Sequence, residues 1–104
     1  AQSKLPTIIF DEIDTGVSGD IAQKMAGILQ RMGNAMQVIA ITHLPQIAGK
    51  GNSHFKIFKE DSANATTTKI EELKGSERVE ELAMMLGGKN IGDSARAHAR
   101  ALLD

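Results

Sequence analysis

Residues 7–19 read TIIFDEIDTGVSG, an apolar run that leads directly into two acids and then into a glycine-containing turn. The run from Thr7 to Phe10 is too short for a helix and rich in β-branched residues, so it predicts a strand buried in a parallel sheet. Asp11 and Glu12 then lie at the carboxyl end of that strand, where open α/β sheets bind ligands. The stretch predicts an α/β fold with a ligand site at one sheet edge.

Adjacent carboxylates at a strand end are typical of Walker B nucleotide sites. In such a site the first acid serves Mg²⁺ and the second orients or deprotonates the attacking water. Asp11 fits the first role and Glu12 the second. Neighbouring residues of an extended strand point to opposite sides, so the chain must turn after Phe10, and Gly16 and Gly19 allow that turn. The simpler interpretation, a pair of surface acids, applies to an isolated Asp-Glu dipeptide that lacks this context.

Cap and turn signals divide the rest of the chain into elements. The expected elements are, in order, a helix capped by Ser18 or Asp20 and ended by Gly33, a strand over residues 37–42, a short helix beginning at Pro45, a hairpin of residues 53–59 and 66–73, a helix capped by Ser76 and ended by Gly87, and a last helix from Asp93. The first helix carries an apolar stripe that predicts packing on the sheet. That stripe consists of Ile21, Met25, Ile28, Leu29 and Met32.

His43 follows the second predicted strand. A strand, helix and strand of this length imply a parallel crossover, so both strands end at the same edge. The His43 imidazole can then reach the ligand of Asp11 and Glu12 and donate to a γ-phosphate oxygen. A lone histidine at a strand end is more often a capping or solvent-facing group, and it is this shared edge that raises His43 above that base rate. Gln46, one helical turn later, either touches nucleotide or a partner or is a plain helix-surface residue.

The amino-acid composition limits the classes of protein to which the chain can belong. The chain has 104 residues, 41% of them hydrophobic and 24% charged, which is ordinary for one small globular domain with an aliphatic core. The absence of cysteine excludes disulfides and thiolate metal sites and is compatible with the cytoplasm. No apolar run is long enough to cross a bilayer, so no membrane partner is expected.

Several polar residues receive structural interpretations. His54, on the hairpin, and His98, on the last helix, lack the converging ligands that a metal site requires. The run Glu77-Arg78 and Glu80-Glu81 is most simply the solvated face of its helix.

Residues 7–19, together with ITHLPQIA at 41–48, resemble the RecN family of bacterial DNA-repair ATPases, which are of the structural-maintenance-of-chromosomes (SMC) type. The resemblance extends through residues 54–56 and 78–83 to the end of the chain. It implies an ABC-like ATPase head, assembled from the two ends of a chain whose middle forms a coiled coil. It also implies DNA double-strand-break repair by recombination, in the bacterial cytoplasm and on the nucleoid.

The resemblance assigns roles to residues. Asp11 would be the Walker B aspartate that acts on Mg²⁺, Glu12 the glutamate that polarises water, and His43 the switch histidine. Residues 14–19 would form the D-loop that crosses a dimer of heads. The expected nucleotide-binding residues are Asp14, Gly16, Ser18, Gly19 and Gln46. Where the broader ABC family usually has leucine-aspartate, Val17-Ser18 stands here, so an aspartate contact across the dimer is not assumed.

The chain has no G-x-x-x-x-G-K-[ST] loop to hold phosphates, and the family's signature motif is also absent. Residues 1–104 are therefore expected to form the carboxy-terminal lobe portion of an ABC-type head, a partial P-loop NTPase with two parallel strands, a hairpin and carboxy-terminal helices. ATP and Mg²⁺ are expected only in the complete head. The expected partners are the remainder of that head, a second head in an ATP-dependent dimer, and DNA through the full-length protein. By itself the chain is expected to be inactive.

Two other functions are open at this stage. The chain could be a nonenzymatic interaction module that binds a partner through helices 76–87 and 93–104. It could also bind DNA directly through Lys50, Lys56, Lys59, Lys69 and Lys74. Scattered lysines at a net charge of −1 are more often solubilising.

Overall fold

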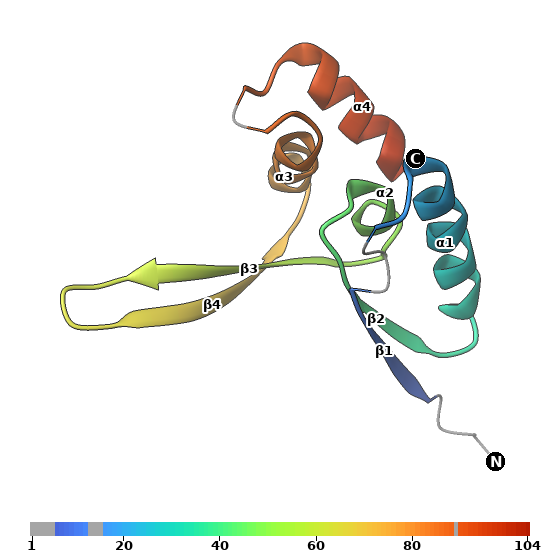
Figure 1. The fold of residues 1–104 in the computed structure, drawn as a ribbon, viewed down its shortest axis with the longest axis horizontal. Helices are drawn as coiled ribbons and strands as arrows, with labels where there is room; N and C mark the ends of the chain where they lie inside the picture. The colour runs from blue at the N-terminus through green and yellow to red at the C-terminus, as the bar shows by residue number, and fades with distance from the viewer. Residues whose placement is uncertain (1–5, 13–15, 89) are drawn as a thin grey trace.

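The computed structural model describes residues 6–12, 16–88 and 90–104. Its helices and strands follow the predicted order and form two separate two-stranded sheets and four helices, as Figure 1 shows. They are β1 (Thr7–Asp11), α1 (Gly19–Met32), β2 (Gln37–Ile41), α2 (Pro45–Ala48), β3 (His54–Asp61), β4 (Thr66–Leu73), α3 (Ser76–Gly87) and α4 (Asp93–Leu103). The predicted α/β class is confirmed.

Strands β1 and β2 pair in parallel, in a register that runs from Thr7 opposite Gln37 to Asp11 opposite Ile41. Helix α1 connects the two strands, so their carboxyl ends lie at the same edge, as predicted. Two hydrogen bonds mark the ends of the pair: Gln37 N donates to Pro6 O at 3.0 Å, and Glu12 N donates to Ile41 O at 2.8 Å. The ladder therefore continues to the residue that follows β1.

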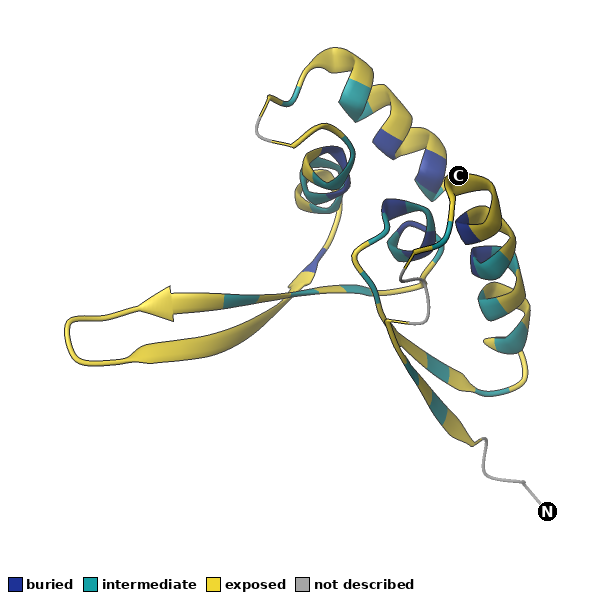
Figure 2. Ribbon diagram, in the orientation of Figure 1, coloured by how far each residue is buried: buried dark blue, intermediate teal, exposed yellow. Residues whose placement is uncertain are grey.

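The predicted burial of β1 is wrong. Ile9 is 61% exposed, and Ile39 and Ile41 on β2 are 42% and 43% exposed. These three side chains share one face of the sheet, because Ile9 lies opposite Ile39 and successive residues alternate between faces. A parallel strand is buried only when both faces are covered, and within the described residues α1 lies on one side only (Figure 2).

Helix α1 is also rotated relative to the prediction. Its buried residues are Ala22 and Ala26, whereas Ile21 and Ile28, from the predicted stripe, are each half exposed. The helix contacts α2 more extensively than it contacts β2. The small alanine side chains allow this close approach of the helices, and the isoleucines are left on the outer side.

The core lies between α2, α3 and α4. Leu82, Ala83 and Ala99 are fully buried, and Ala48 and Val79 are among the partly buried side chains packed against them. The buried hydrophobic residues are all aliphatic, as predicted. Arg96 on α4 ties this helix to α3 by donating to both carboxylate oxygens of Glu80, at 2.8 and 3.2 Å. This hydrogen bond from Arg96 holds the pKa of Glu80 below its usual range.

The predicted hairpin is confirmed. Strands β3 and β4 pair antiparallel from His54 opposite Leu73 to Asp61 opposite Thr66, and in Figure 1 the hairpin projects away from the helices. Its outer face exposes Phe55, Ile57 and Ile70. At its base, Lys56 forms an ion pair of 2.9 Å with Glu81 of α3.

The predicted caps are only partly confirmed. Ser18 occupies the N-cap position of α1 in extended conformation, but its side chain makes no capping hydrogen bond. Ser76 is the first residue of α3, and the cap position belongs to Gly75, which has φ of 58°. Glycine is the residue that adopts this left-handed conformation at no steric cost, so the turn between β4 and α3 selects Gly75 as the cap in place of serine.

Candidate functional site

The predicted site residues of the two strands meet at one edge of the sheet. Asp11 ends β1 and lies opposite Ile41, the last residue of β2, while Glu12 follows β1 and His43 lies two residues after Ile41. All three side chains belong to exposed residues. Two carboxylates and an imidazole are thus carried by solvent-exposed residues at the same end of the two strands.

Glu12 has an unusual backbone. Its φ is 53°, and it is the only non-glycine residue with positive φ in the described part of the chain. The left-handed region is sterically costly for residues with a Cβ, and such outliers cluster at functional sites. This conformation provides the turn that the sequence requires, because it breaks the strand alternation directly after Asp11.

Two substitutions measure that strain. Glu12→Gly and Glu12→Ala both remove the carboxylate and any contact it makes, but only glycine relieves the positive φ. We expect the glycine variant to be more stable than the alanine variant by about 1 kcal/mol. Denaturant unfolding of the two variants side by side checks this difference. An alanine variant that is more stable than the glycine variant by about 0.4–1 kcal/mol, the difference that unfolded-state entropy alone gives, would show that the backbone at residue 12 is unstrained.

The other predicted site residues lie around the start of α1. Gly16 has φ of 79°, so glycine is required in this turn. Ser18 precedes α1, and Gly19 is its first residue. The Gln46 Nε2 atom lies 3.6 Å from the position that a Cβ on Gly19 would occupy, so Gln46 of α2 reaches the same turn. Asp14 lies outside the described residues.

The side-chain amide of Gln46 is not fully in solvent. Its Oε1 atom is buried and has no hydrogen-bond partner within the described structure. A plain helix-surface glutamine would have this oxygen in water. The structure therefore favours a glutamine that is packed between α2 and the start of α1 over the solvent-exposed alternative.

The donor set at this edge fits a magnesium ion that arrives with a nucleotide. Mg²⁺ prefers oxygen ligands and is commonly held by one or two carboxylates together with phosphate oxygens and water. Asp11 supplies one exposed carboxylate at the sheet edge. Among the described residues, no group of three or more histidine, cysteine, aspartate or glutamate side chains gathers to hold a metal alone. The described residues thus contribute only part of the coordination shell.

Sequence reasoning missed the role of Arg78, which was interpreted as part of a solvated face. Its Nη2 atom donates to the carbonyl oxygens of Ala48 and Gly51, at 3.0 and 2.7 Å. The sequence did contain a signal that Arg78 has a specific partner. Arg78 lies in the first turn of α3, where acids are favoured and a basic residue opposes the helix dipole. Glu81 also forms an ion pair and its side chain is only 19% exposed, so the solvated-face interpretation is wrong for Arg78 and Glu81. Glu80 pairs with Arg96, but its side chain remains 46% exposed.

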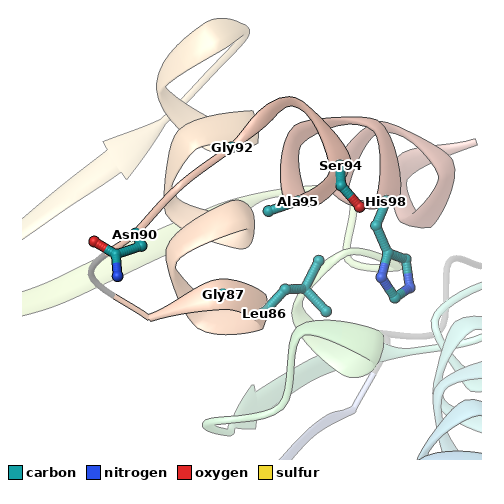
Figure 3. A pocket seen from close by; sticks show the side chains of 7 residues that line it. All are labelled: Leu86, Gly87, Asn90, Gly92, Ser94, Ala95 and His98. Atoms are coloured by element: carbon teal, nitrogen blue, oxygen red, sulfur yellow. The ribbon is translucent and has the colours of Figure 1, made fainter.

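A hollow also lies elsewhere in the described part of the molecule. It has a volume of about 480 Å³ and lies at the turn between α3 and α4, as Figure 3 shows. Leu86, Gly87, Asn90, Gly92, Ser94, Ala95 and His98 line it. No acid accompanies the exposed His98 there, so the hollow offers no acid–base pair. The sheet edge remains the candidate site.

None of the helices in the described ranges has the length and apolarity needed to span a membrane. No protein-family model matches the chain.

The fold is that of SMC ATPases. A solved structure described under "ATP-driven dimerization and DNA stimulated activation of SMC ATPases" matches with a TM-score of 0.64 and 16% identity, over 82% of this chain and 50% of that one. The sequence is similar to DNA repair protein RecN of several bacteria. DNA repair protein RecN of Haemophilus influenzae is 43% identical over 99% of this chain, and RecN of Bacillus subtilis is 41% identical over 99%. RecN of Rickettsia conorii is 45% identical over 94%.

The chain is therefore a segment of the RecN type, and the family resemblance seen in its motifs is confirmed. It spans about 18% of the length of these relatives.

Proposed function

We propose that this chain forms the Walker B side of an SMC-like ATPase head that acts in DNA double-strand-break repair and recombination. The carrying observation is the shared edge, where Asp11 ends β1, Glu12 follows it, and His43 lies just beyond β2, the parallel neighbour. The similarity to RecN over nearly the whole chain supports the class of activity.

Each residue has a distinct task in this proposal. Asp11 holds Mg²⁺, directly or through water, and bound Mg²⁺ would neutralise charge on the phosphate oxygens. Glu12 orients or deprotonates the attacking water, and its left-handed backbone turns its side chain out of the strand alternation. His43 donates a hydrogen bond to a γ-phosphate oxygen. Gly16, Ser18 and Gly19, with Asp14, form the loop toward a second head, and Gln46 supports that loop from α2.

The phosphate loop must come from outside these 104 residues, so the first partner is the remainder of the head. The face of β1 and β2 that exposes Ile9, Ile39 and Ile41 is the surface to which we assign it. Exposed apolar side chains that cluster on one sheet face mark an interface. A second head and DNA are partners of the full-length protein, which we place on the bacterial nucleoid.

Direct DNA binding by this chain is not favoured. Four of the five lysines considered for it have partners: Lys50 donates to Asp104 O, and Lys56, Lys69 and Lys74 lie within 4.0 Å of Glu81, Glu60 and Glu72. The interaction-module alternative is also weakened, because the apolar stripes of α3 and α4 pack on each other and on α2.

Asp11→Asn in a full-length RecN-type protein that carries this sequence tests the metal role. We expect Mg²⁺-dependent phosphate release from ATP to fall by about 100-fold or more, because the neutral amide holds Mg²⁺ poorly. The matched control is Asp93→Asn, whose fully exposed carboxylate lies at the start of α4. Unchanged ATP turnover in Asp11→Asn across a titration of MgCl₂ would exclude Asp11 as a metal ligand.

A further inference from the structure

Helix α2 is a single turn, and short isolated helices are unstable because nucleation is costly. Its position must therefore be fixed by neighbouring elements. Two contacts link the end of α2 to α4 and the residue after it. Leu102 packs so closely on Gly49 that a Cβ on Gly49 would lie 3.0 Å from the Leu102 Cβ. Lys50 Nζ donates to Asp104 O at 2.7 Å. From α3, the contact is Arg78.

Arg78 binds the carboxyl end of α2 in the manner of a helix cap. Its Nη2 atom donates to Gly51 O at 2.7 Å and Ala48 O at 3.0 Å, with a longer contact of 3.5 Å to Gly49 O. The last carbonyls of a helix have no partner within the helix, and arginine side chains commonly satisfy them. These bonds join α3 to a segment about 30 residues earlier in the chain.

The surroundings of Arg78 make this contact specific. Burial lowers the pKa of Arg78, but a guanidinium remains charged at any ordinary pH. The pKa of the neighbouring His54 is lowered by burial and by the Arg78 charge, which outweigh the opposing effect of Glu81. The imidazole beside the guanidinium is therefore neutral. The positive charge of Arg78 faces the carbonyl oxygens at the carboxyl end of α2.

The amino end of α2 continues directly into the candidate site. Leu44 N donates to Thr42 Oγ1 at 3.0 Å, and Leu44 O accepts from Ile47 N and Ala48 N at 3.2 and 3.1 Å. His43 lies between the two residues of the first bond. A displacement of α2 therefore moves the backbone on both sides of His43.

We propose that Arg78 is a positioning residue for His43: by holding the carboxyl end of α2, it fixes the imidazole relative to Asp11 and Glu12. This inference rests on the proposed function, in which His43 donates a hydrogen bond to a γ-phosphate oxygen. Arg78 itself touches no reacting atom. Its effect is transmitted through four residues of helix and the Leu44–Thr42 hydrogen bond.

The test uses the full-length RecN-type protein with Arg78→Ala, Arg78→Lys and, as a matched control, Arg96→Ala. Arg96 is also a partly exposed arginine paired to another element, but its partners are Glu80 and Asp93, not α2. We expect Arg78→Ala to lower kcat for ATP roughly tenfold to hundredfold, since small misplacements of a catalytic group have effects of this size. KM for ATP should change less than kcat does, because Arg78→Ala displaces only the His43 contact and leaves the other contacts to ATP in place.

Arg78→Lys should recover part of the lost kcat, because an ammonium still donates to the carbonyls but lacks the planar fork of a guanidinium. Arg96→Ala should leave kcat unchanged within about twofold, because the ion pairs of Arg96 are to Glu80 on α3 and to Asp93 on its own helix, and not to α2. A kcat of Arg78→Ala equal to that of Arg96→Ala would overturn the positioning role.

A double-mutant cycle separates this inference from the proposed function. If Arg78 acts through His43, adding Arg78→Ala to His43→Ala should lower kcat by less than about twofold more. Fully multiplicative losses would overturn the inference and leave the function intact. If His43→Ala alone leaves turnover unchanged, His43 has no role in hydrolysis, and the inference fails together with the His43 part of the proposed function. The roles of Asp11 and Glu12 are then decided by their own variants. Should Arg78→Ala not fold, as judged by circular dichroism, Arg78→Lys takes its place in the same cycle.

Discussion

Glu12→Gln is expected to slow ATP hydrolysis by about 100-fold to 10,000-fold in a full-length RecN-type protein that carries this sequence, which is the usual contribution of a general base. The substitution keeps the size of the side chain and removes its charge. The amide cannot take a proton from water, whereas Asp11 and the metal site stay intact. ATP binding should therefore persist, and ATP-bound heads should accumulate.

Single-turnover phosphate release and nucleotide binding, measured on the same sample, separate these two effects. Glu60→Gln, an exposed acid near the tip of the hairpin, is the matched control and should hydrolyse ATP normally. Normal hydrolysis by Glu12→Gln would remove the central base from the proposal. Loss of ATP binding together with hydrolysis would instead indicate a structural role for Glu12.

Leu82→Ala is the substitution with the largest expected effect on stability. Leu82 is 0% exposed and is the largest fully buried side chain in the described structure. It lies where α3 meets α4 beside Ala83 and Ala99, which are too small to fill the space it would leave. We expect the free energy of unfolding to fall by about 3 kcal/mol, from lost burial and from the cavity. In a domain of this size that is a large part of the total.

Met84→Ala is the control for Leu82→Ala. Met84 lies two residues away on the same helix and is 46% exposed, so its loss should lower stability by only about 0.5 kcal/mol. Denaturant unfolding of the 104-residue chain compares the two. Similar losses in both variants would place the core somewhere other than the α3–α4 contact.

Local patterns predicted the shared edge of the candidate site. The apolar runs, the glycine turns and the crossover length were enough to place Asp11, Glu12 and His43 at one end of two parallel strands, because these features depend on nearby residues. The ends of α1 and α3 at Gly33 and Gly87 follow from the same chemistry.

Burial was harder to predict, because it depends on what covers a face. A strand of isoleucines has the same sequence pattern in a covered sheet as in this sheet, where Ile9 and Ile39 are exposed. Helix α1 offered two apolar faces, and the packing on α2 selected the one with Ala22 and Ala26. Arg78 makes contacts 27 to 30 residues away in sequence, a separation that no local pattern encodes.

The most direct measurement of the central claim is an experimental structure of the complete head with a nonhydrolysable ATP analogue and Mg²⁺. The account predicts that the Asp11 carboxylate lies on the metal or on its water, that Glu12 contacts the water facing the γ-phosphate, and that His43 donates to a γ-phosphate oxygen. It also predicts that the face with Ile9, Ile39 and Ile41 is covered by the rest of the head. A nucleotide bound away from the β1–β2 edge, with these three polar side chains in bulk solvent, would contradict the account.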